Sequence, residues 1–116
     1  MKGGLPVIAP ALPAERRAAT RRQPTLGTIC RVTLDGGENL IGLVWNISTS
    51  GLSMLVHRQL VAGTVLQGLL STSNEQSSLA IAFRVAHVGP LRTGDYIIGG
   101  PFLHPLDIGE MEPFVI

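Results

Sequence analysis

The sequence has few of the residues on which several common classes of protein depend. Its single cysteine, Cys30, excludes an internal disulfide and a zinc finger of the cysteine type. Only 4% of the residues are aromatic and the net charge is +1, which excludes a strongly basic nucleic-acid wrapper and weighs against a basic groove with stacking platforms for single strands. No apolar run approaches the ~20 residues that cross a bilayer. We therefore expect a cytoplasmic protein without membrane insertion.

The chain is long enough for one hydrophobic core and too short for two. A chain of 116 residues folding alone buries roughly two-thirds of its unfolded surface. Its 14 glycines and 8 prolines predict a domain rich in turns. Pro6, Pro10 and Pro13 interrupt the first residues, so we expect a flexible N-terminal arm over residues 1–14 and a single domain over residues 15–116.

Short segments of alternating apolar and polar residues follow the arm and predict strands. A hairpin is expected around Asp35-Gly36-Gly37, and Pro105 and Pro113 limit the C-terminal region to a short helix. The spacing of the strands favours a small antiparallel barrel or sandwich over alternating strands and helices. The six expected strands cover residues 28–34, 40–45, 51–57, 64–70, 78–88 and 95–103.

Arginines are concentrated just before the first expected strand. Arg17 and Arg21 form an R-x-x-x-R spacing, with Arg16 and Arg22 beside them. Side chains four residues apart point the same way in both a helix and a strand. Two guanidinium groups so placed can bind one anion, because each makes bidentate bonds to phosphate or to the edge of a guanine. The alternative interpretation is a solvated basic arm.

A second motif, N-x-S-x-x-G, lies between two expected strands at Asn46, Ser48 and Gly51. Asn and Ser side chains near a turn present hydrogen-bond donors and acceptors, and glycine adopts positive φ or lets a flat ligand approach the backbone. Such a turn could read the edge of a base. The alternative is an ordinary Asx-type turn that leads into the next strand.

In this order, and separated by a predicted hairpin, the two motifs resemble those of the PilZ domain family, whose members bind the bacterial second messenger cyclic di-GMP (c-di-GMP). The resemblance covers about residues 15–114 and extends to the Glu15-Arg16-Arg17 start and to residues 96–103. It implies an all-β fold, a six-stranded antiparallel PilZ-type β-barrel with a short C-terminal helix. The N-terminal arginine-rich loop is then expected to fold across the outer surface of the barrel.

The resemblance also implies a ligand site. The arginine pair is expected to grip guanine and phosphate groups, and the second motif to hold a guanine base; the five residues are Arg17, Arg21, Asn46, Ser48 and Gly51. Asn46 stands where many members have Asp, which weakens its bonds to guanine N–H groups. Supporting roles fall to Arg16 and Arg22 through their charge, and to Trp45, which either stacks on a guanine or packs in the domain.

The expected function is a c-di-GMP receptor or adaptor that closes its arginine loop onto the barrel and signals to an unknown partner protein. Neither an enzyme nor a metal site is expected: no catalytic set is visible, and His57, His87 and His104 match no metal-ligand spacing. No cofactor other than the ligand is implied. The alternatives are a PilZ-like barrel that binds only proteins and a small barrel that binds single-stranded nucleic acid. The oligomeric state stays open.

Overall fold

The computed structural model describes residues 22–25 and 27–115. Arg16, Arg17 and Arg21 therefore lie outside the described residues, and Arg22 is the first one inside them. A four-residue helix α1 (Ile108–Met111) and a short 3₁₀ helix η2 (Glu112–Phe114) follow the last strand. The seven strands are β1 (Ile29–Thr33), β2 (Asn39–Ile47), β3 (Gly51–Val56), β4 (Val65–Ser71), β5 (Ser78–Arg84), β6 (His87–Pro90) and β7 (Tyr96–Pro101).

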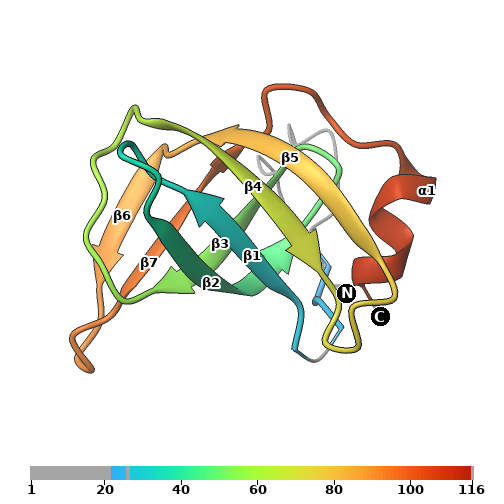
Figure 1. The fold of residues 1–116 in the computed structure, drawn as a ribbon, viewed down its shortest axis with the longest axis horizontal. Coiled ribbons are helices and arrows are strands. Elements are labelled where there is room, and N and C mark those ends of the chain that lie inside the picture. Colours follow the sequence, from blue (N-terminus) through green and yellow to red (C-terminus); the bar gives the residue numbers. More distant parts are fainter. Residues whose placement is uncertain (1–21, 26, 116) are drawn as a thin grey trace, which may run out of the picture.

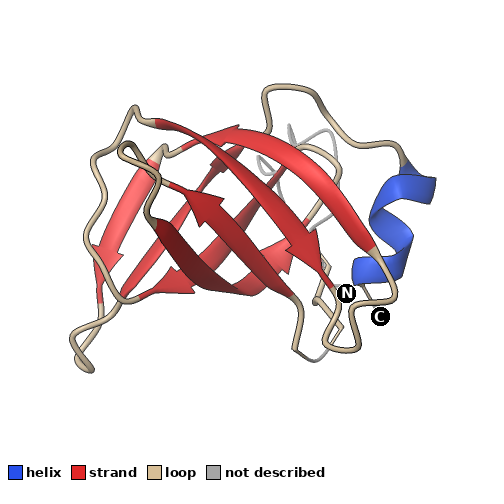
Figure 2. Ribbon diagram, viewed as in Figure 1, coloured by secondary structure: helices blue, strands red, loops and turns tan. Residues whose placement is uncertain are grey.

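All seven strands belong to one antiparallel sheet in the order β5-β4-β1-β2-β3-β7-β6. The sheet is curled into a half-barrel, with α1 near one end (Figures 1 and 2). The two outer strands, β5 and β6, are consecutive in the chain, and a bridge between Phe83 and Phe102 brings the β5 edge to the residue after β7. The all-β fold class predicted from the sequence is confirmed.

The strands alternate as their sequences predict, with one set of side chains in the barrel core. In β1, Cys30 and Val32 are fully buried while Arg31 and Thr33 are exposed. Gly68 of β4, which pairs with Val32, leaves room for the Cys30 side chain: a Cβ on Gly68 would lie 2.7 Å from the Cys30 sulfur. Cys30 is thus a core residue.

The expected strand over residues 78–88 is two strands in the structure, which accounts for the difference between six and seven. The chain changes partner at the break. Val85 donates a backbone hydrogen bond to the Thr64 carbonyl, just before β4, at 2.8 Å, and Ala86 donates to Gly99 of β7 at 2.8 Å. Gly100 makes this corner possible, because a side chain there would overlap the Arg84 carbonyl. The alternation of apolar and polar residues does not predict this change of neighbouring strand.

The predicted C-terminal helix is present and short. Asp107 caps α1: its carboxylate accepts the Glu110 N–H at 2.8 Å, and the Glu110 side chain accepts the Asp107 N–H at 3.0 Å. This reciprocal capping box satisfies two backbone donors that the helix itself cannot. Met111 and Phe114 are buried in the core, so the helical segment packs against the sheet through these two side chains.

Candidate functional site

The turn between β2 and β3 carries the N-x-S-x-x-G motif and is organised around one hydroxyl. Ser48 Oγ accepts the backbone N–H groups of Ser50 at 3.1 Å and Gly51 at 3.2 Å. The Ser48 N–H in turn donates to the Gly51 carbonyl at 2.9 Å. Ser48 is only 5% exposed. The structure therefore gives this hydroxyl a role within the turn, in which it fixes the path of the backbone.

Asn46 lies beside a β-bulge, where the register of β2 against β3 shifts between Val44 and Asn46. A bulge re-aims the side chains that follow it. The Asn46 side-chain oxygen accepts the Ser53 hydroxyl at 3.0 Å, which fixes the orientation of the amide on the outer side of the sheet. Trp45, within the bulge, is 58% exposed, so it does not pack in the core.

Gly51 allows β3 to lie close to β7. A Cβ at this position would lie 2.5 Å from the Gly100 carbonyl oxygen and 3.1 Å from the Pro101 Cα, both on β7. Its backbone is not in the positive-φ region, unlike that of Gly36 and Gly37 in the β1–β2 turn. Positive φ, which the sequence offered as a reason for glycine at this position, does not apply. Glycine is required here because β3 and β7 pack closely.

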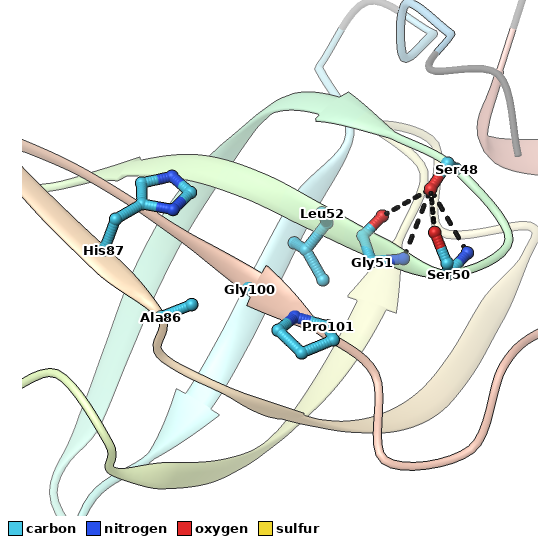
Figure 3. Close-up of a pocket in the computed structure, with 8 residues that line it drawn as sticks. All are labelled: Ser48, Ser50, Gly51, Leu52, Ala86, His87, Gly100 and Pro101. Atoms are coloured by element: carbon cyan, nitrogen blue, oxygen red, sulfur yellow. Dashed lines mark hydrogen bonds between the residues drawn. The ribbon is translucent and has the colours of Figure 1, made fainter. Parts of the chain in front are cut away.

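A surface pocket of about 330 Å³ opens beside this turn (Figure 3). That volume is at the lower end of the range of about 300–1,000 Å³ for small-molecule sites. Ser48 and Ser50 lie on one side and His87 on the other, with Leu52 and Gly100 between them. The full lining consists of Ser48, Ser50, Gly51, Leu52, Ala86, His87, Gly100 and Pro101.

His87 is a site residue that the sequence did not reveal. Strand register puts Ser53 opposite Gly99 on β7 and Gly99 opposite His87 on β6, so these residues lie in one row that continues from Asn46. A Cβ on Gly99 would be 2.8 Å from the His87 ring, which shows that the ring lies against this glycine. Nothing in the sequence links this histidine to the turn.

Arg22 lies at the end of β2, next to the same turn. Its N–H donates to the Ile47 carbonyl at 2.8 Å, and its carbonyl accepts the Ile47 N–H at 3.1 Å. Ile47 directly precedes Ser48 in the chain. Arg21, the last residue of the R-x-x-x-R motif, directly precedes Arg22 in the chain.

The described residues include no group of three or more His, Cys, Asp or Glu side chains that could hold a metal ion. Burial raises the pKa of the Cys30 thiol to about 12, and at that pKa the thiol is not a nucleophile at neutral pH. Across residues 22–25 and 27–115, no helix combines the length and apolar character needed to span a bilayer. The pocket beside the turn is the candidate site, because Ser48 and Gly51 of the second motif line it.

Comparison with known proteins identifies the fold. No protein-family model and no curated protein matches the chain. Among solved structures, the K. pneumonia MrkH–c-di-GMP complex is 21% identical, with a TM-score of 0.65, over 76% of this chain and 44% of MrkH. YcgR from Escherichia coli in complex with c-di-GMP is 16% identical, with a TM-score of 0.68, over 84% of this chain and 42% of YcgR.

A third structure, the PilZ domain of E. coli YcgR with c-di-GMP, is 13% identical, with a TM-score of 0.68, over 85% of this chain and 86% of that domain. The chain spans less than half the length of MrkH and of full YcgR. The match is thus to the PilZ domain of such proteins and not to their whole length. The curled sheet, the short C-terminal helix and these similarities agree: the chain has the PilZ-type fold.

Proposed function

We propose that the chain is a c-di-GMP receptor that binds the dinucleotide on the outside of the barrel, in the pocket between the β2–β3 turn and His87. One observation carries the proposal. The fold is that of solved complexes with c-di-GMP, Ser48 and Gly51 of the N-x-S-x-x-G motif line a surface pocket, and Arg22, which directly follows the R-x-x-x-R motif, joins the sheet beside it.

The three residues of the second motif have different roles in this proposal. The Asn46 amide, oriented by Ser53, faces outward to hydrogen-bond a guanine edge. Ser48 acts through the backbone, because its hydroxyl holds the turn in shape. Gly51 keeps β3 and β7 close enough to form a shallow floor on which a planar base can lie.

The arginines supply charge. Arg17 and Arg21 grip the phosphates and a guanine of the ligand, Arg16 adds to the local positive potential, and Arg22 anchors the segment at Ile47. Trp45 is exposed next to Asn46 and offers a ring on which a guanine can stack. About four to six charge-assisted contacts of about 1.5–3 kcal/mol each, less the cost of ordering the loop, are compatible with micromolar affinity.

Binding would close the arginine segment onto the barrel and change the surface that a partner protein meets. The chain is then a binding module whose output is an altered interaction, with no catalytic step. This conclusion fits a site built from turn backbone, an amide and arginines.

Calorimetric titration of the full chain with c-di-GMP, and with GTP as the control nucleotide, tests the proposal. We expect saturable binding of c-di-GMP that weakens as salt increases, and no binding of GTP. The double substitution Arg17→Ala/Arg21→Ala should abolish binding. Arg92→Ala, an exposed arginine in the β6–β7 turn, is the matched control and should bind normally.

Two results contradict the proposal in different ways. If the unsubstituted chain does not bind c-di-GMP at high micromolar concentration, the receptor function is wrong and the interaction-only barrel takes its place. If it binds but the double arginine variant binds equally well, the ligand is correct and the assignment of the arginine pair is wrong.

A further inference from the structure

The outside of the barrel carries an apolar surface away from the pocket. On a half-exposed antiparallel sheet the solvent-facing positions are ordinarily polar. Three successive outward positions of β2 are instead apolar: Ile41 is 50% exposed, Leu43 47% and Trp45 58%. On β4, Leu69 is 37% exposed. We call these four residues, together with Arg31 of β1, the outer apolar face.

Strand register makes this face continuous. Arg31 on β1 pairs with Ile41 on β2 and with Leu69 on β4, so its side chain lies between theirs. β4, β1 and β2 are neighbours in the sheet and run side by side in Figure 1. A contiguous apolar patch on the outside of a small domain is typical of a protein-interaction site.

The charge of the face is of one sign. Arg31 is exposed, and within the described residues it makes neither an ion pair nor a side-chain hydrogen bond. A second exposed arginine, Arg84, pairs with Val65 further along the same side of the sheet. None of the seven strands contains Asp or Glu. A carboxylate that pairs with Arg31 must therefore come from outside the sheet.

The strands that form the face have no free backbone edge, because β1, β2 and β4 are each hydrogen-bonded to neighbours on both sides. A partner therefore cannot bind here by adding a strand, and it must bind through side chains. Apolar side chains for the β2 row and carboxylates for Arg31 are the chemistry that matches this surface.

The molecules that could cover the face differ in whether they can supply a carboxylate to Arg31. A second copy of the chain docked through this same face would bring arginines against arginines, since its own strands supply no acid. The N-terminal arm over residues 1–14 has Lys2 as its one charged side chain, so it offers no carboxylate either. We infer that the outer apolar face docks an acidic amphipathic segment of a partner protein.

This inference names the surface through which the proposed function would reach a partner protein. The docking itself does not require that the chain bind c-di-GMP. It does give the relay a physical basis, because Trp45 of the face and Asn46 of the nucleotide site are adjacent in the chain. The guanine stack proposed above and a docked segment would both use the Trp45 ring, so either ligand can alter the binding of the other.

Selection from a library of random peptides displayed on phage, panned on the full chain without nucleotide, tests the inference. We expect the selected peptides to combine apolar residues with Asp or Glu. Trp45 is the only tryptophan of the chain, so a synthetic copy of a selected peptide should shift its fluorescence to shorter wavelength. Arg31→Glu and Leu43→Ser should each weaken peptide binding about tenfold or more.

Ile108→Ser is the matched control, because Ile108 is 65% exposed but lies at the start of α1, outside the sheet. It should leave peptide affinity unchanged, and circular dichroism should show that all three variants are folded. Selected peptides without acidic residues, or equal binding by the Arg31→Glu variant, would overturn the inference. A dimer seen by sedimentation and lost in Leu43→Ser would also overturn it, since the occupant would then be a second copy.

Because the selection is made without nucleotide, its failure is distinct from failure of the receptor proposal. Peptides that meet the expectation in a chain that never binds c-di-GMP would support the docking face and contradict the receptor function. Calorimetric binding of c-di-GMP with no acidic peptide selected would do the reverse.

Discussion

Replacing Ser48 with alanine should weaken the fold as well as ligand binding. The hydroxyl accepts the N–H groups of Ser50 at 3.1 Å and Gly51 at 3.2 Å. Ser48 is 5% exposed, so water has little access to replace the lost acceptor. At about 0.5–1.5 kcal/mol for each hydrogen bond, Ser48→Ala should lower the free energy of unfolding by about 1–3 kcal/mol.

The corresponding change in melting temperature follows from the size of the domain. At about 4 °C for each kcal/mol in a chain of this length, the Tm should fall by about 4–12 °C. Affinity for c-di-GMP should fall too, because the turn that positions Asn46 and Gly51 loses its internal support. Ser48→Thr keeps the hydroxyl and should preserve most of both properties.

Urea unfolding followed by circular dichroism, with calorimetry on the same samples, measures both effects. Ser78→Ala, at an exposed position of β5, is the control and should change neither. The reasoning is refuted if Ser48→Ala loses affinity while its unfolding midpoint stays at the value of the unsubstituted chain. That result would make the hydroxyl a direct ligand contact and not a support for the turn.

Four other predictions concern the core, the strand contact, the helix and the amide. Since burial raises the pKa of the Cys30 thiol from 9.0 to about 12, the unfolded chain loses this proton first as pH rises. Stability should therefore fall above pH 9 by up to about 1.4 kcal/mol per pH unit, a slope that urea titrations should not find in Cys30→Ala. Gly51→Ala places a Cβ 2.5 Å from the Gly100 oxygen and should destabilise the domain by about 1–3 kcal/mol. Gly109→Ala, which meets only an ordinary 3.5 Å contact within α1, should instead stabilise it by about 0.5–1 kcal/mol in the same assay. Asn46→Asp replaces an amide by a charged acceptor and should raise c-di-GMP affinity about five- to tenfold by calorimetry; unchanged or weaker binding would contradict the proposed contact with guanine N–H groups.

Local patterns were sufficient for most of the fold. Alternation in β1 and β2 and the Gly36-Gly37 turn predicted the first hairpin, because side-chain period and positive φ are properties of a few neighbouring residues. The short C-terminal helix was predicted for the same reason, from Pro105 and Pro113. The break after Arg84 was missed, since alternation continues across it and only the hydrogen-bond partner changes.

The candidate site was predictable only in part. The N-x-S-x-x-G spacing pointed to the β2–β3 turn, and the structure puts that turn at a pocket. The use of the Ser48 hydroxyl within the turn and the contact of Gly51 with Gly100 depend on atoms that a spacing does not describe. His87 could not be linked to Asn46 from the sequence, because four strands must pair in register before the two share a row.

The amino-acid sequence alone therefore sets the strand-rich fold class, the turns, the burial of Cys30 and the two motifs, all of which arise from interactions between near neighbours in the chain. Tertiary structure decides which of these residues come together in a pocket or on a common surface. Pairing of β7 with β3 and with β6 builds the pocket, and pairing of β1 with β2 and with β4 puts Arg31, Ile41 and Leu69 side by side on one outer face. Both outcomes depend on strand order and register, which are set by long-range contacts that no local pattern encodes.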